Sequence, residues 1–541
     1  MGADPVLAAL AAACPAARPA QPGDAVAGMM PRFAASPATI AEASELLRTA
    51  AAHDLAVVPR GGGSKLGWGA PPRRVDLIVD TSGLDRVLEH AAGDLVVRAQ
   101  AGVTLAQLGE VLAGAGQQLA LDPPPVPLAV ARTRGGSGAG AAAGSEAPSG
   151  ANGAAPQWRG ATIGGRLATG ARPSAAAAPA GASAPSPWLG ATIGGTLATG
   201  AAGPRRLRYG TPRDLLIGIT VVRADGTVAH SGGKVVKNVA GYDLGKLFTG
   251  SFGTLGLIVE AVFRLHPRPA SASYVTVDCD GPDEAYRAVA AAAGSELAPS
   301  AIELDRPARG QPVRVAVLVE GDPDGTAERT GLMRALLGRG AATQPSAPGW
   351  WGWPANGNGR SGRGQHAEAR PGDARPGDAR PGDARPGDAR PGDGQPGGAA
   401  DAGAGTLIRI GFWAAGLPQI LRAVDAAALA AGLDPAVGGS AAAGVIYAAA
   451  GPDADPAAVA AFVSGLRGAL ARGDGDARPA PAPVPDGPPV PASAVVVHAP
   501  PRARDLMDLW GPVPSLSLMR AVKDQFDPGH RMAPGRFAGG I

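Results

Sequence analysis

Three glycine-rich segments have the composition from which a ligand site could be built. Glycine allows a ligand to approach the main chain closely, and consecutive backbone N–H groups can form an anion-binding nest. Such a nest could hold a pyrophosphate, each charge-assisted hydrogen bond contributing about 1.5–3 kcal/mol. The residues of these segments that we expect to hold the ligand are Arg60, Gly61, Gly62, Gly63, Ser64, Gly190, Thr192, Ile193, Gly194, Gly195, Gly253, Thr254 and Gly256.

The position of each segment beside a strand supports this reading, because a glycine run alone is more often a flexible turn. Residues 56–60 form a short strand that runs directly into the first segment. A strand over 215–222 follows the second segment, and an apolar strand over 257–265 follows the third. Ligand-binding turns commonly lie at strand ends, so we expect one shared ligand, with Gly195 at positive φ where the backbone meets it.

The elements around the first segment alternate between helix and strand. A helix is predicted from Ser36 as N-cap, then strands over 56–60, 75–80 and 95–99, then a helix capped by Thr104. After residue 222, Asp225-Gly226 predicts a tight hairpin. These patterns predict an α+β fold.

Two nucleotide-binding motifs are excluded. The Gly-x-x-x-x-Gly-Lys-Ser/Thr spacing of a P-loop is missing. Gly138-Ala139-Gly140 lies in low-complexity sequence rather than after a strand.

An internal near-repeat complicates the second segment. Residues 158–170 almost duplicate residues 188–200, and they lie in an Ala/Gly/Ser/Pro-rich insertion over about 126–187. Only the second copy continues into a predicted strand. We therefore assign ligand binding to Gly190–Gly195 and none to the first copy.

A second α+β unit is predicted downstream, in two parts. Its first part covers 269–345 and its second part, with a C-terminal tail, covers 405–541. Between them, 346–404 contains five copies of Ala-Arg-Pro-Gly-Asp from Ala369 to Asp393, a composition typical of a disordered linker. For the tryptophans at 350–353, packing or chance composition is favoured over anchoring a partner.

Composition excludes several classes of protein. The chain has 541 residues, a net charge of +3 and 4% aromatic residues, without the basic, aromatic-rich surface of a nucleic-acid-binding protein. Cys14 and Cys279 are too few for a disulfide framework or a four-thiolate iron–sulfur cluster, so any cluster must sit on another chain. No apolar run approaches the ~20 residues of a transmembrane helix. We expect a cytoplasmic protein, with any association with the inner membrane made through partner subunits.

At the glycine segments and at Lys237-Asn238-Val239-Ala240-Gly241-Tyr242-Asp243, the chain resembles the vanillyl-alcohol oxidase/p-cresol methylhydroxylase (PCMH) superfamily. Within it, the chain is most similar to the FAD-binding E subunits of bacterial glycolate oxidases. The resemblance implies a two-subdomain PCMH-type FAD-binding domain over 31–268, after an N-terminal extension over 1–30, followed by an α+β cap domain. Residues 61–64 and 190–195 would hold the pyrophosphate and adjoining parts of FAD, with 253–256 and Ile258 along the same cofactor. Ser64 stands where covalent members often carry a tethering histidine, which implies noncovalent FAD.

The resemblance also implies a function and partners. This would be the FAD-binding subunit of a complex that oxidises glycolate, a small 2-hydroxy acid, to glyoxylate. Its partners would be a catalytic flavin D subunit and an iron–sulfur F subunit, and it would be inactive alone. The cap lacks the histidine-rich Gly-Asp-Gly-Asn segment of the D subunits, so we assign no catalytic base and no metal site. Two alternatives remain: a self-sufficient FAD-dependent 2-hydroxyacid dehydrogenase, and a non-catalytic assembly subunit with structural FAD.

Overall fold

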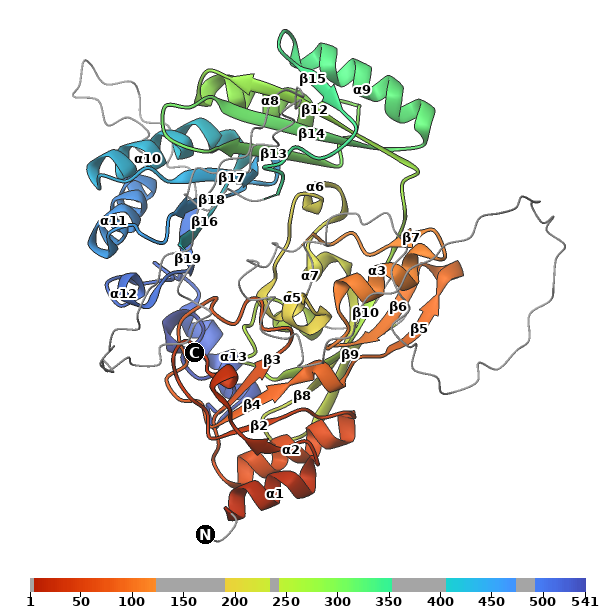
Figure 1. Ribbon diagram of the computed structural model, residues 1–541, viewed down its shortest axis with the longest axis vertical. Coiled ribbons are helices and arrows are strands. Elements are labelled where there is room, and N and C mark those ends of the chain that lie inside the picture. The colour runs from red at the N-terminus through yellow and green to blue at the C-terminus, as the bar shows by residue number, and fades with distance from the viewer. Residues whose placement is uncertain (1–3, 123–189, 234–242, 353–404, 473–491) are drawn as a thin grey trace, which may run out of the picture.

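The computed structural model describes residues 4–122, 190–233, 243–352, 405–472 and 492–541. Its elements form a four-stranded and a five-stranded sheet in the lower part of Figure 1 and an eight-stranded sheet in the upper part, together with one two-stranded sheet. The first part of the chain builds the two lower sheets, and the α+β class predicted from the sequence is confirmed.

The first subdomain is built on a four-stranded sheet in the order β1-β2-β4-β3. β2, β4 and β3 are parallel, and β1 pairs antiparallel with β2. Helix α2 has Thr39 as its N-cap, whose Oγ1 accepts a hydrogen bond from the Glu42 N–H at 3.1 Å, so the prediction of Ser36 as N-cap is wrong. The elements are α1 (Pro5–Ala13), β1 (Arg18–Pro19), β2 (Phe33–Ala35), α2 (Ile40–Ala52), β3 (Val57–Arg60) and β4 (Leu77–Asp80).

The N-terminal residues are part of this subdomain rather than an extension from it. Leu10 and Cys14 are fully buried in the same core as Leu46 and Leu47 of α2. The core of the first sheet therefore begins within the 1–30 stretch that the sequence suggested was separate.

The second subdomain is an antiparallel sheet in the order β5-β6-β10-β8-β9. The predicted hairpin at Asp225-Gly226 is confirmed, with Gly226 at φ +82 between β8 and β9. Its elements are β5 (Val87–Ala91), β6 (Val96–Gln100), α3 (Leu105–Ala113), α5 (Ile193–Thr199), α6 (Arg206–Tyr209), α7 (Pro212–Leu215), β8 (Leu216–Val222), β9 (Val228–Gly232) and β10 (Leu257–Arg264), with β7 (Gln117–Gln118) and β11 (His266–Pro267) pairing separately.

The cap is one eight-stranded antiparallel sheet in the order β15-β12-β14-β13-β17-β18-β16-β19. β13 and β17 pair with each other, so the two parts of the cap that the sequence separates are joined through backbone hydrogen bonds. β17 contains Gly438-Gly439, and because of these glycines the sequence did not predict a strand there. The strands are β12 (Ser271–Cys279), β13 (Ala301–Arg306), β14 (Val313–Gly321), β15 (Ala342–Gln344), β16 (Thr406–Phe412), β17 (Ala436–Ser440), β18 (Val445–Ala450) and β19 (Ala492–His498).

Helices cover the outer face of the cap sheet in Figure 1. They are α8 (Pro282–Ala293), α9 (Pro323–Leu337), α10 (Leu417–Ala430) and α11 (Pro456–Arg472). Side chains alternate along each strand, so Ile302 and Leu304 of β13 enter the core beneath these helices. Glu303 must then point to the opposite face. That inner face is turned toward the two smaller sheets, where the Tyr209 hydroxyl donates to Glu320 Oε2 at 3.2 Å.

Two of the tryptophans pack on this inner face. The Trp351 and Tyr274 rings pack edge to face, with their centroids 5.0 Å apart. The Arg314 guanidinium lies 5.3 Å from the Trp350 ring centroid. Residues 346–352 thus contact the cap sheet, so the linker cannot begin at 346 as the sequence suggested. The Ala-Arg-Pro-Gly-Asp copies and the first copy of the glycine repeat lie outside the described residues.

The C-terminal segment leaves the cap and returns to the first subdomain through α12 (Pro501–Arg504) and α13 (Leu516–Phe526). The Val57 N–H donates to Arg531 O at 2.8 Å, and the Ala533 N–H donates to Val57 O at 2.7 Å, which extends the first sheet beside β3. Within the ranges described above, no helix is both long and apolar enough to span a membrane.

A fully buried ion pair fixes this return. Lys523 Nζ donates to Asp527 Oδ2 at 2.6 Å, to Thr254 O at 2.7 Å and to Met532 O at 2.9 Å. Desolvation lowers the pKa of Lys523, while the Asp527 carboxylate acts in the opposite direction. One amino group therefore joins α13, the C-terminal segment and the third glycine segment.

We predict that Lys523→Met lowers the free energy of unfolding by about 3–5 kcal/mol, because it leaves Asp527 buried without its counter-charge. Urea denaturation followed by circular dichroism measures this. The matched control is Arg48→Met, which removes one partner of the exposed Arg48–Glu45 pair and should cost less than about 1 kcal/mol. Equal small losses in both variants would contradict the prediction.

Candidate FAD site

The first two glycine segments touch each other at the end of β3. A Cβ atom added at Gly62 would lie 1.6 Å from Gly190 O, and one added at Gly61 would lie 2.2 Å from Thr192 Oγ1. No side chain fits at either distance. Two segments more than one hundred residues apart in the sequence are thus in backbone contact, as the shared-ligand prediction requires.

The glycines beside this contact border open space. Gly63 at φ +78 and Gly190 at φ +89 adopt backbone conformations that L side chains disfavour. A Cβ at either position would meet no atom within 4 Å. Backbone that is free of side chains and open on one side fits a ligand that must approach the main chain closely.

The rest of the second segment is helical rather than a turn. Thr192 caps α5, its Oγ1 accepting from the Gly195 N–H at 3.2 Å. Ile193 is fully buried in the core, and a Cβ at Gly194 would lie 2.8 Å from Ala101 Cβ. Gly195 lies inside the helix without a positive φ, so that part of the prediction is wrong. Gly195 has helical backbone angles because it follows the Thr192 N-cap, and the positive φ falls instead on Gly190, before the cap.

The third segment packs against the strand that leads into the first. A Cβ at Gly253, φ +76, would lie 3.2 Å from Pro59 Cγ, and one at Gly256 would lie 2.9 Å from Val222 O. Thr254 is buried and its hydroxyl donates to Ser251 O at 2.7 Å. Ile258 is a core residue of β10. The structure therefore brings all three segments together, but the Thr254 hydroxyl bonds to the protein's own backbone and Ile258 packs in its core.

Arg60 fixes the base of the first loop. Its Nη2 lies 2.9 Å from both Asp24 Oδ1 and Asp80 Oδ2. Burial tends to raise the pKa of Asp24, but hydrogen bonds from Arg18, Gln21 N–H and Arg60 outweigh it and lower that pKa to about 2. Since its guanidinium is engaged by two carboxylates, Arg60 orients the loop. Asp24 lies in the stretch that the sequence treated as an extension.

Lys65 lies beside the first glycine loop, and the sequence analysis did not single it out. Its side chain is buried, and Nζ lies 3.4 Å from Ser64 Oγ and 6.0 Å from the Trp68 ring centroid. Desolvation lowers its pKa to about 8, and no carboxylate of the described residues lies within 4.0 Å. A lysine two residues after a glycine run was the available signal. Its unpaired charge beside the first loop fits a ligand phosphate.

Arg536 holds the turn that follows Lys65. Its Nη2 donates to Leu66 O and Trp68 O, each at 2.7 Å. Desolvation, with a smaller effect from Arg504, lowers the pKa of Arg536 to about 10. The C-terminal segment thus shapes the first loop.

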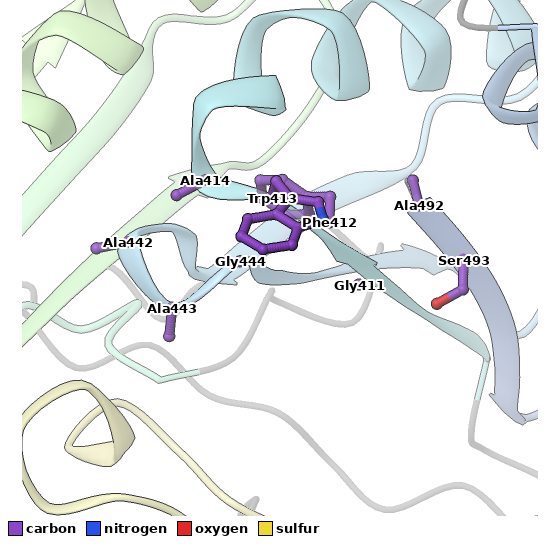
Figure 2. A pocket seen from close by; sticks show the side chains of 9 residues that line it. All are labelled: Gly411, Phe412, Trp413, Ala414, Ala442, Ala443, Gly444, Ala492 and Ser493. Atoms are coloured by element: carbon purple, nitrogen blue, oxygen red, sulfur yellow. The ribbon is translucent and has the colours of Figure 1, made fainter. Parts of the chain in front are cut away.

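A surface groove of about 640 Å³ lies on the cap, where β16, β18 and β19 meet (Figure 2). Phe412, Trp413 and Ser493 line it together with alanines and glycines. None of its lining residues is titratable. Among the described residues, no group of three His, Cys, Asp or Glu side chains is arranged to hold a metal ion.

Comparison with known proteins indicates the class of protein to which this arrangement of glycine segments belongs. The family described as "FAD binding domain" matches residues 31–148 and 160–232, a match that runs through both copies of the glycine repeat. A crystal structure of p-cresol methylhydroxylase with substrate bound superposes with a TM-score of 0.58 and 13% identity, over 98% of this chain and 96% of that chain. The chain therefore carries an FAD-binding domain and has the PCMH-type fold, and FAD is its cofactor.

Two curated relatives are similar to it in sequence. Glycolate oxidase subunit GlcD of Bacillus subtilis is 26% identical over 279 residues, 51% of this chain and 46% of that protein. Glycolate oxidase subunit GlcE of Escherichia coli is 46% identical over 68 residues, 13% of this chain and 19% of that protein. The chain thus spans less than half the length of either relative.

We predict that Gly62→Ala weakens FAD binding by about tenfold or more, because the new methyl group cannot coexist with Gly190 O. Fluorescence titration of FAD into the flavin-free chain measures the Kd. Gly93→Ala is the control, since a Cβ there meets nothing within 4 Å and the residue has no positive φ. A Gly62→Ala variant that is folded by circular dichroism and binds FAD like the control would contradict the role of this contact.

Proposed function

We propose that this chain is the FAD-binding subunit of a glycolate oxidase or dehydrogenase complex that converts glycolate to glyoxylate. The observation that carries the proposal is the 46% identity to GlcE of Escherichia coli, on a chain with an FAD-binding domain. The 2-hydroxy acid is the substrate in this proposal, and a catalytic flavin D subunit and an iron–sulfur F subunit are the partners. The complex works in the cytoplasm, with contact to the inner membrane made through the partners.

Bound FAD supplies an acceptor for the two electrons released when an alcohol becomes a carbonyl. The chain's own residues bind and shield it. Gly61–Gly63 and Gly190 present backbone to the cofactor, and Lys65 offers a cation beside the first loop. Arg60 and Arg536 keep that loop in shape.

Electron transfer onward requires the partner chains. Cys14 and Cys279 are the two cysteines of the sequence, and both are buried. Desolvation raises the pKa of both thiols, that of Cys279 to about 11. Neither provides the thiolate that a cluster ligand needs, so we assign the iron–sulfur cluster to the F subunit.

Anaerobic mixing with glycolate tests the proposed function. The flavin absorbance of the full chain should bleach when the partner subunits are present and stay unchanged when the chain is alone. Bleaching of the isolated chain would support a self-sufficient dehydrogenase instead. No bleaching of this chain's flavin under either condition would support a structural role for FAD.

We also predict that the FAD is noncovalent, because Ser64 supplies no imidazole for a flavin bond. Precipitation with acid should release all of the yellow colour into the supernatant, where its absorbance quantifies FAD. Colour that stays with the washed protein pellet would contradict this.

A further inference from the structure

Lys65 is a buried cation to which the described part of the protein offers no counter-charge. The residue is 8% exposed, and its Nζ lies 3.4 Å from Ser64 Oγ. The other buried lysine of the described residues, Lys523, is paired with Asp527 at 2.6 Å. A buried charge is costly unless it is paired, so the ammonium group of Lys65 lacks the anion that would offset its burial.

The acidic residues around the first loop do not supply this anion. Desolvation alone lowers the pKa of Lys65, and no carboxylate in the described ranges acts to raise it. At the base of the loop, Asp24 and Asp80 are both bound by Arg60, and Asp24 is also bound by Arg18. These two carboxylates are therefore compensated by arginines and not by Lys65.

A second buried cation holds the turn in which Lys65 lies. Arg536 is 4% exposed, and its Nη2 donates to Leu66 O and Trp68 O, each at 2.7 Å. Its Nη1 is buried and has no hydrogen-bond partner among the residues that the structure describes. Desolvation and the charge of Arg504 both lower the pKa of Arg536, and no carboxylate opposes them. The turn over residues 65–68 therefore has an excess of positive charge.

A hydrogen bond keeps Lys65 close to the open part of the first loop. The Leu66 N–H donates to Gly63 O at 3.2 Å, which closes a turn that contains Ser64 and Lys65. A Cβ atom on Gly63 would meet no atom within 4 Å, and the same holds for Gly190. The lysine thus belongs to the same turn as a glycine that borders open space.

The diphosphate of FAD is an anion that matches this turn. It is doubly charged at neutral pH, and lysine binds phosphate oxygens as a compact point charge. The Ser64 hydroxyl and the backbone N–H groups of the glycine run can donate hydrogen bonds to the same oxygens. The oxidised flavin ring is neutral, so it would not compensate the two buried cations.

We propose that Lys65 binds the diphosphate of FAD and makes the affinity of the site depend on the phosphates of the cofactor. Arg536 holds the turn in place and adds its positive charge. The proposal rests on the FAD-binding part of the proposed function and is independent of glycolate as the substrate.

Fluorescence titration of the flavin-free full chain with FAD tests this role. Lys65→Met removes the charge and keeps an unbranched apolar side chain, so the Kd for FAD should rise by about tenfold or more. Without flavin, the same variant should unfold at an unchanged or higher temperature, because a buried unpaired charge has been removed. A purely structural lysine would instead give a lower unfolding temperature.

Arg74→Met is the matched control, because it also removes one positive charge. Arg74 pairs with Asp54 and Asp76. It precedes β4, which runs parallel to β3, so it lies at the end of these strands opposite to the glycine loop. The Kd of this variant for FAD should stay unchanged.

Phosphorus NMR of bound FAD identifies the part of the cofactor that the lysine contacts. At saturating FAD, the diphosphate resonances should move in Lys65→Met and stay in place in Arg74→Met, with the same flavin absorbance spectrum in both. Lys65→Arg keeps a positive charge and should bind FAD more tightly than Lys65→Met does.

Four results would each overturn the proposal. They are an unchanged Kd in Lys65→Met, a lower unfolding temperature of that variant without flavin, equal weakening in Lys65→Arg and Lys65→Met, and a changed flavin spectrum with unmoved phosphorus resonances. The last result would assign the lysine to the flavin ring. A wild-type chain that does not bind FAD would contradict the proposed function as well, whereas failure of the lysine tests alone leaves that function intact.

Discussion

The structure depends on one close backbone approach, that of Gly62 to Gly190 at the end of β3. The missing Cβ atoms allow two distant segments to share a boundary, and the open sides of Gly63 and Gly190 border the space beside them. The surrounding interactions hold this contact in place. Arg60 ties the first loop to Asp24 and Asp80, and the third glycine segment packs on Pro59.

The C-terminal segment makes the cap and the FAD-binding part interdependent. It completes the cap sheet with β19, then returns to extend the first sheet beside β3. Lys523 and Arg536 both donate to backbone carbonyls around the glycine segments. Because these cations are buried, each carbonyl contact also offsets part of their desolvation. The relative placement of the two parts thus depends on the same residues that shape the cofactor loops.

Local patterns in the sequence predicted the glycine segments, most strands and the hairpin at Asp225-Gly226, because strand alternation and turn chemistry are short-range signals. Gly195 was misplaced because a Thr cap converts that stretch into a helix. Asp24, Lys65 and Glu303 were not found. Two of them make contacts between distant segments: Asp24 meets Arg60, and Glu303 meets Ser440 137 residues later. Neither spacing nor composition records such contacts.

The central claim is that the three glycine segments form one FAD site. Hydrogen–deuterium exchange of the flavin-free full chain, with and without added FAD, tests it most directly. We predict that FAD slows exchange together in peptides covering residues 61–65, 190–195 and 253–256, with no comparable change in the outer cap helices α10 and α11. Protection that omits the first two segments, or that appears only in the cap, would contradict it.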